Sequence, residues 1–66
     1  MTLTGRLFQA RMWREYAMMH DGPIRLRGKL YTPEWAKQIL RVPRDQCLRR
    51  ARINIYLARR ITRQHG

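Results

Sequence analysis

The fold is limited above all by RDQCLRRARINIYLARRITRQ, residues 44–64, a stretch with the length and apolar spacing of one long helix. Pro43 ends any preceding helix by restricting Val42 to extended geometry, and Asp45 stands in the first turn, where the helix dipole favours a negative charge. Helical spacing predicts a main packing stripe made of Leu48, Ala51, Ile55, Ala58 and Ile61. Another element or a partner must therefore cover this stripe.

The middle of this helix, residues 53–58, is apolar nearly all round. Ile53, Tyr56 and Leu57 fall outside the main stripe, which is expected when other macromolecules enclose a helix. Arginines stand on both sides of this central segment: Arg49, Arg50 and Arg52 before it, and Arg59, Arg60 and Arg63 after it. They are predicted to contact either RNA phosphates, with Tyr56 stacked on a base, or carboxylates of neighbouring protein subunits. A solvated cationic surface would explain the arginines but not the central segment.

The chain is short, and its sequence offers few internal supports. Sixty-six residues form at most one small domain, residues 1–66, which is marginally stable alone. Cys47 is the only cysteine, so no disulfide can form within the chain. His20 and His65 are too far apart in sequence to be a recognisable pair of metal ligands. The remaining support is a partner macromolecule.

The charge of the chain indicates what kind of partner this is. Fifteen Lys and Arg residues stand against four acidic residues, which gives a net charge of +11. A molecule with this charge repels its own copies and attracts polyanions or acidic protein surfaces. Thirteen of the basic residues are arginine, whose planar guanidinium pairs with phosphate or carboxylate through two hydrogen bonds. We therefore expect a negatively charged partner.

The N-terminal segment is predicted to form a helix over residues 5–20, with Thr4 as its N-cap and the sequence Asp21-Gly22-Pro23 at its end. Its expected packing face consists of Phe8, Met12, Trp13, Tyr16 and Met19. Arg6, Arg11 and Arg14 precede the first acidic residue, as in an amphipathic mitochondrial transit segment. The segment therefore favours a mitochondrial location.

The middle of the chain is predicted to contain a linker and a short helix. Residues 24–31 alternate apolar and basic side chains, and with no second strand candidate an extended linker is expected. A helix over residues 33–41 follows, with Thr32 as N-cap, Pro33 at the first position and Trp35 on its apolar side. The expected fold is all-α, extended and non-globular without partners.

Catalysis has little support in the sequence. The four acidic residues are scattered, and no glycine-rich phosphate loop, carboxylate pair or Ser/His/Asp arrangement is present. Cys47 is interpreted as a buried structural cysteine. We expect no enzymatic activity, no cofactor, no metal, no small-molecule substrate and no membrane span, since no apolar stretch approaches the roughly 20 residues that cross a bilayer.

Three stretches of the chain are informative together: REYAMMHD at residues 14–21, ILRVPRD at residues 39–45 and RRARINIYLARR at residues 49–60. They resemble the small matrix-side subunit 7 family of respiratory complex III. The spacer GPIRLRGKLY is longer than in the family, the acids after the first stretch are reduced to Asp21, and the family's later helical region has no counterpart. The resemblance implies an all-helical, non-catalytic subunit that docks on cytochrome b and the core proteins without a firmly bound cofactor.

The sequence thus predicts a structural or assembly subunit of a large mitochondrial complex, with the matrix side of complex III preferred. The alternative is an arginine-rich ribosomal protein, mitochondrial or other, that binds rRNA. A third possibility is a helix-turn-helix DNA-binding protein, because a short helix, a proline turn and a basic helix follow one another. Against that possibility, the central segment is apolar where a recognition helix needs polar side chains.

Overall fold

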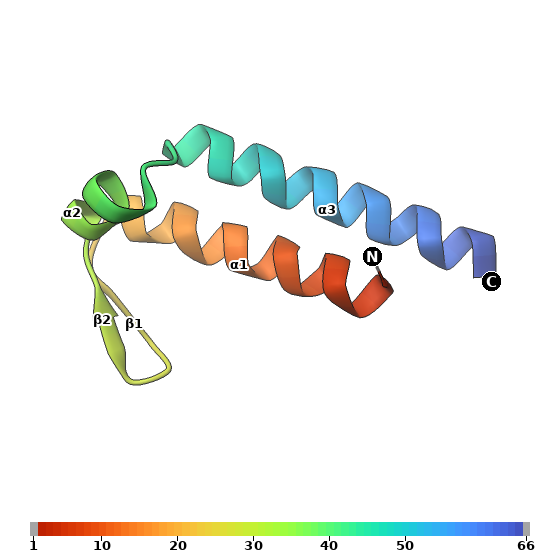
Figure 1. The fold of residues 1–66 in the computed structure, drawn as a ribbon, viewed down its shortest axis with the longest axis horizontal. Helices are drawn as coiled ribbons and strands as arrows, with labels where there is room; N and C mark the ends of the chain where they lie inside the picture. The colour runs from red at the N-terminus through yellow and green to blue at the C-terminus, as the bar shows by residue number, and fades with distance from the viewer. Residues whose placement is uncertain (1, 66) are drawn as a thin grey trace.

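Two long antiparallel helices lie side by side, and a β-hairpin and a short helical segment connect them at one end (Figure 1). The computed structural model describes residues 2–65. The elements in chain order are α1 (Leu3–Asp21), β1 (Ile24–Leu26), β2 (Lys29–Tyr31), α2 (Pro33–Trp35), η1 (Ala36–Leu40) and α3 (Arg44–His65). Both termini lie at the end opposite the hairpin. The predicted all-α class is confirmed, with the β-hairpin as an addition.

The ends of α1 differ slightly from the prediction. The helix begins at Leu3, and its N-cap is Thr2, whose Oγ1 accepts a hydrogen bond from the Gly5 N–H at 3.1 Å. Thr4, the predicted cap, lies inside the first turn. Both threonines can cap a helix, and the one further upstream gives the longer helix. The long C-terminal helix, predicted over residues 44–64, spans Arg44–His65.

The extended linker predicted for residues 24–31 is wrong, because these residues fold back on themselves as a β-hairpin. Ile24 pairs with Tyr31, and Leu26 pairs with Lys29 in antiparallel register. Arg27 and Gly28 form the two-residue turn with φ angles of 50° and 80°. Two successive positive φ angles match the twist of the strands, as in a type I′ turn. The second strand was thus present within the same eight residues.

Gly28→Ala is expected to destabilise the hairpin by about 1–2 kcal/mol, since an L side chain at a φ of 80° is strained. No atom lies within 4 Å of an added Cβ, so the cost arises from the backbone alone. Hydrogen exchange of the Lys29–Tyr31 amides would report faster local opening. Unchanged exchange at these amides would contradict the assigned turn.

The short helical segment between Thr32 and Arg41 changes its hydrogen-bond pattern along its length. Thr32 Oγ1 accepts from the Trp35 N–H at 3.2 Å, as expected for an N-cap. Residues 36–40 then form a π-helical turn, closed by the Arg41 N–H, which donates to the Ala36 carbonyl at 2.9 Å. Arg41 has a left-handed backbone with φ of 59°, which ends the helix and turns the chain toward α3.

The contact between α1 and α3 is built from small side chains, not from the large residues of the predicted stripe. Its buried residues, all less than a tenth exposed, are Ala10 and Ala17 on α1 and Cys47, Ala51, Asn54 and Ala58 on α3. Residues 10 and 17, like 51 and 58, are seven positions apart and thus on one side of a helix. The side chains of Leu48, Ile55 and Ile61 are half-buried beside this line. Small residues let the two backbones approach closely, which excludes larger side chains from the centre.

A second cluster packs beneath the short helical segment. The ring centroids of Tyr16 and Trp35 are 6.4 Å apart, and those of Tyr31 and Trp35 are 4.9 Å apart. Met19 is 1% exposed and Ala36 is fully buried. The face predicted on α1 is therefore only partly a packing face, because Tyr16 and Met19 pack whereas Phe8 remains 56% exposed.

The molecule is elongated, with principal extents of 41 × 24 × 16 Å. Its radius of gyration is 13.3 Å, against about 11 Å for a compact chain of this length. Among residues 2–65, neither long helix has the sustained hydropathy that crossing a bilayer requires. Most of the surface of α3 therefore remains outside the intramolecular core.

Candidate polyanion-binding surface

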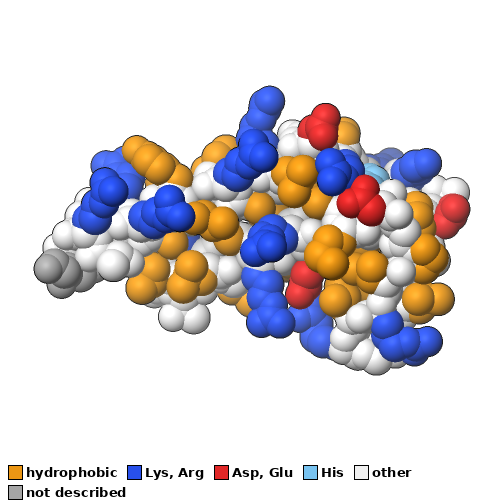
Figure 2. Space-filling view, turned by 180° about the vertical axis from the view of Figure 1, so that it is seen from behind, with side chains coloured by type: hydrophobic (Ala, Val, Ile, Leu, Met, Phe, Trp, Pro, Cys, Tyr) orange, Lys and Arg blue, Asp and Glu red, His pale blue; other side chains and the backbone are white. Residues whose placement is uncertain are grey.

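Charge is divided between the two ends of the helical pair. Residues 2–14 and 46–64, which we call the terminal half, reach from the chain ends to the first turn of α3 and contain nine arginines and no acidic residue. The four acidic residues, Glu15, Asp21, Glu34 and Asp45, all belong to the half that carries the hairpin. In Figure 2 the acidic side chains lie away from the terminal end, and basic side chains alternate with hydrophobic ones along the helices. The terminal half is therefore uniformly cationic.

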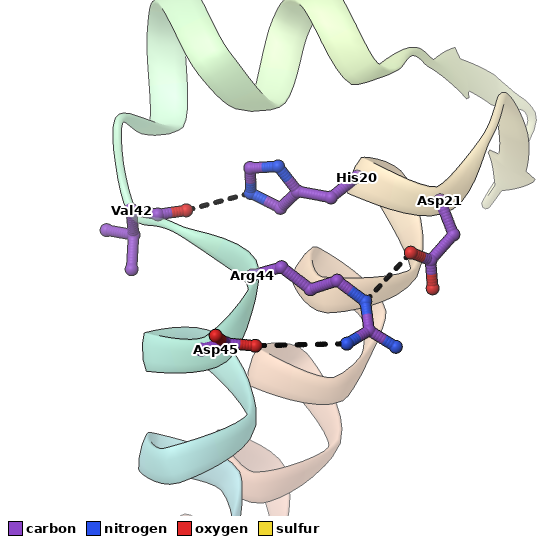
Figure 3. Close-up of polar contacts among 5 residues, drawn as sticks. All are labelled: His20, Asp21, Val42, Arg44 and Asp45. Carbon is purple, nitrogen blue, oxygen red and sulfur yellow. Dashed lines mark hydrogen bonds and ion pairs between the residues drawn. The ribbon is translucent and has the colours of Figure 1, made fainter.

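The acidic residues that form ion pairs are engaged by arginines of the hairpin half and of α1. Figure 3 shows the Arg44 guanidinium between Asp21, at 2.8 Å, and Asp45, at 4.0 Å. Glu15 pairs with Arg11 and Arg27, each at 3.5 Å. Within residues 2–65, no acid pairs with any of the six arginines predicted as contacts on α3. The described acids therefore leave these six guanidinium groups without an ion-pair partner.

Five of the six predicted contact arginines are exposed along the side of α3 that faces away from α1. Together with Tyr56, which is 61% exposed, they form a surface that we call the outer ridge: Arg49, Arg52, Tyr56, Arg59, Arg60 and Arg63. Each of them has another member three or four positions away, and such pairs lie about 5–6 Å apart on one side of a helix. From residue 49 to residue 63 the ridge is about 21 Å long.

Two arginines lie against aromatic rings. The Arg60 guanidinium carbon is 6.0 Å from the centroid of Tyr56, within the outer ridge. Arg50, the sixth predicted contact, is half-buried and lies 4.6 Å from the centroid of Trp13 on α1. A cation over an aromatic face is stabilised by the ring quadrupole. Arg50 therefore helps to join the two helices, and the outer ridge contains the arginines that remain free.

The residues predicted to pack against partners occupy three different environments. Ala51 and Ala58 are buried against α1 of the same chain, and this leaves almost no surface for a partner. Half-buried positions are held by Leu48, Ile55, Leu57, Ile61, Met12, Trp13, Tyr16 and Trp35. Ile53, Tyr56 and Phe8 are 49%, 61% and 56% exposed. Only the last group presents large apolar surface to solvent.

Asn54 is a structural residue that the predicted packing stripe does not include. It is 8% exposed, its Oδ1 accepts from the Arg6 guanidinium at 3.1 Å, and its Nδ2 donates to the Arg50 carbonyl at 2.8 Å. A buried amide with both ends bonded fixes the register of two packed helices. The seven-residue spacing between Cys47 and Asn54 was the available signal.

Cys47 is enclosed where α3 begins. Its side chain is fully buried, and its Sγ donates to the Val42 carbonyl at 3.6 Å. Burial raises the pKa of the Cys47 thiol above its usual value near 9, and the Arg50 charge opposes this only in part. The thiol is therefore protonated at neutral pH and poorly nucleophilic, as a structural cysteine should be.

Stability is expected to fall as pH rises above about 9, in part through Cys47. The folded thiol holds its proton more tightly than the unfolded one. Its contribution is thus fully present below the unfolded pKa and is lost as pH rises through the folded pKa. Urea unfolding between pH 7 and 11 should show a weaker pH dependence for Cys47→Ala. An identical slope in the variant would contradict the assignment.

The chemistry available at other sites is limited. Within residues 2–64, no three side chains from His, Cys, Asp and Glu lie close enough together to hold a metal ion. The His20 ring donates its Nε2–H to the Val42 carbonyl at 2.8 Å, so this nitrogen is engaged in joining the end of α1 to the start of α3 (Figure 3). The outer ridge is therefore the surface with the most distinctive chemistry.

Comparison of the chain with protein-family models, with curated protein sequences and with solved structures found no match.

Proposed function

We propose that this protein is a non-catalytic structural component of a large assembly, and that the outer ridge of α3 binds RNA there. The observation that carries the proposal is the row of unpaired arginines on the outer ridge, in a half of the molecule that has no acidic residue. Arginines concentrated on one exposed helix face are the electrostatic footprint of nucleic-acid binding.

The electrostatic contribution follows from the arrangement of these charges. Five exposed guanidinium groups over about 21 Å can replace condensed counterions along a phosphate backbone. Because the four acids lie outside the terminal half, the charge distribution of the molecule is asymmetric. The molecule would therefore approach a polyanion with its terminal half first. Arginine also binds phosphate through two parallel hydrogen bonds, which lysine cannot do.

Tyr56 provides a reason to prefer RNA that contains single-stranded segments. Its ring is exposed in the middle of the outer ridge, with Arg49 and Arg52 before it and Arg60 after it. Unpaired bases stack on aromatic side chains and on guanidinium planes, whereas bases within a duplex are inaccessible. Binding by phosphate contacts with one stacked base is therefore the expected mode.

The proposal is tested by measuring the binding of a labelled single-stranded oligouridylate and of an RNA duplex across a series of salt concentrations. We expect log K to fall linearly with log salt, with a slope of about −3 to −4 for the single strand if five phosphates are contacted. Tyr56→Leu should weaken single-strand binding severalfold and leave duplex binding unchanged. Salt-independent binding would contradict the proposal.

A second candidate is a subunit on the matrix side of respiratory complex III, as the resemblance of three sequence stretches implies. The exposure of Ile53 and Phe8, 49% and 56%, favours a partner with apolar surface, such as a protein. Arg6, Arg11 and Arg14 support a mitochondrial location for either assembly. Purification of the native particle separates the two candidates. RNA that follows the chain favours the first, and haem absorbance that follows it favours the second.

A further inference from the structure

A groove runs along one side of the helical pair and borders the outer ridge, with which it shares Arg59 and Arg63. Two adjoining depressions of about 450 and 430 Å³ share Leu7 of α1 and Ile55 of α3, so they form one continuous groove. Leu3, Leu7, Met18 and Ile55 provide its apolar lining. Leu7 and Met18 are 51% and 52% exposed, although they lie directly beside the buried line of small residues. The groove therefore exposes apolar surface between α1 and α3, which form its two walls.

The walls of the groove are strongly basic. Arg11 and Arg14 line it from α1, and Arg59 and Arg63 line it from α3. Glu15 is the single acid among the lining residues, and it already pairs with Arg11 and Arg27. An occupant must therefore combine an apolar strip with negative charge on both sides of it. A second copy of this chain does not fit this description, because its net charge is also +11.

We propose that this groove is a docking site for an acidic amphipathic helix from another protein. The apolar lining from Leu3 to Met18 covers about 22 Å of α1, which corresponds to about 15 residues of a docked helix. Such a helix would complete a three-helix bundle, with apolar residues at every third or fourth position between α1 and α3. Its Asp and Glu side chains would lie beside the arginines of both walls. This site goes beyond RNA binding: its apolar lining lies outside the outer ridge, and the two surfaces share only Arg59 and Arg63.

The test uses the full-length protein and a labelled synthetic peptide of about 18 residues, with Leu at every third or fourth position and Glu on both flanks. A second peptide of the same composition has Leu and Glu interspersed, so that no apolar side forms. Fluorescence anisotropy should show the amphipathic peptide binding at least about tenfold more tightly. Equal binding of the two peptides would overturn the proposal, since it would show attraction by net charge alone.

Matched substitutions locate the site. Leu7→Gln should weaken peptide binding about tenfold, whereas Ile53→Gln, at a position equally exposed but outside the groove, should have no effect. Arg14→Gln should weaken it severalfold. Circular dichroism confirms that each variant is folded. Equal losses from Leu7→Gln and Ile53→Gln would overturn the groove as the site.

Two other occupants are distinguished in the same series. The first is a lipid surface. If neither peptide bound, and the protein sedimented with anionic vesicles but Leu7→Gln did not, the occupant would be a lipid surface and the proposal would be overturned. Oligouridylate binding reduced by Leu7→Gln as strongly as peptide binding would place the groove within the RNA surface and also overturn it. If the peptide did not bind, RNA binding by the outer ridge could still be tested separately. Variants at residues 49, 52 and 60 measure it, because these residues do not line the groove.

Discussion

Replacing Arg49, Arg52 and Arg60 together by glutamine is expected to weaken the binding of single-stranded RNA roughly hundredfold at about 0.1 M salt. Each phosphate contact with a single strand contributes about 0.7 to the slope of log K against log salt, so the slope should become shallower by about 2. The three side chains are exposed and belong to no ion pair with a described acid, so fold stability should change little. Titrations at several salt concentrations measure both effects.

A matched control removes three positive charges elsewhere. Arg25, Lys29 and Lys37 lie on the hairpin and the short helical segment, outside the outer ridge, and all three are exposed. Glutamine at these three positions should reduce affinity far less than the change on α3, because long-range attraction between exposed charges is screened within about 10 Å. If both triple variants lost affinity equally, the net charge and not the outer ridge would determine binding.

Ala51→Leu is expected to lower the melting temperature by about 10–20 °C. Ala51 is 2% exposed where α3 meets α1, so three added carbon atoms can be accommodated only if the helices separate. Overpacking of this kind costs about 1–3 kcal/mol. A domain of this size has a total stability of about 3–10 kcal/mol, so the loss is a large fraction of it. Thermal unfolding followed by circular dichroism measures the change.

Gln46→Leu provides the comparison for this variant, because it places the same side chain on α3 at an exposed position. We expect a change in stability within about 0.5 kcal/mol there. If Ala51→Leu melted at the temperature of the unaltered protein, the close approach of α1 and α3 would be contradicted. Ala58→Leu should behave like Ala51→Leu, because Ala58 is 3% exposed in the same line of small residues.

The helix boundaries could be predicted from the sequence, whereas the hairpin could not. The start of α3 after Pro43 and the Thr32 cap of α2 follow from local chemistry, and both were predictable. The hairpin was missed because Arg27-Gly28 is a less common turn pair than Asn-Gly, although Gly28 tolerates the positive φ. The buried line was predicted only in part. Ala51, Ala58 and Cys47 were expected to be buried, and they are. Ala10 and Asn54 were missed, because alanine has little apolar surface and asparagine is polar.

For the candidate surface, the sequence identified the arginines. It did not show which of them contact other residues of the chain and which face solvent. Arg50 and Arg52 are two positions apart, yet one lies on Trp13 and the other faces solvent. Likewise, Arg44 pairs with Asp21, which is distant in the sequence. Contacts between α1 and α3 decide these differences, and a single helical segment carries no information about its neighbour.

The sequence alone therefore determined the two long helices, the charge of +11 and the absence of acids from residues 46–64, which contain the six arginines of α3 predicted as contacts. These properties depend on local backbone preferences and on composition, which act within a few residues. The tertiary structure decided which side of each helix is covered, which arginines remain free and where the groove lies. Those features depend on how closely two helices approach, and the distance is set by side-chain volumes on both helices at once.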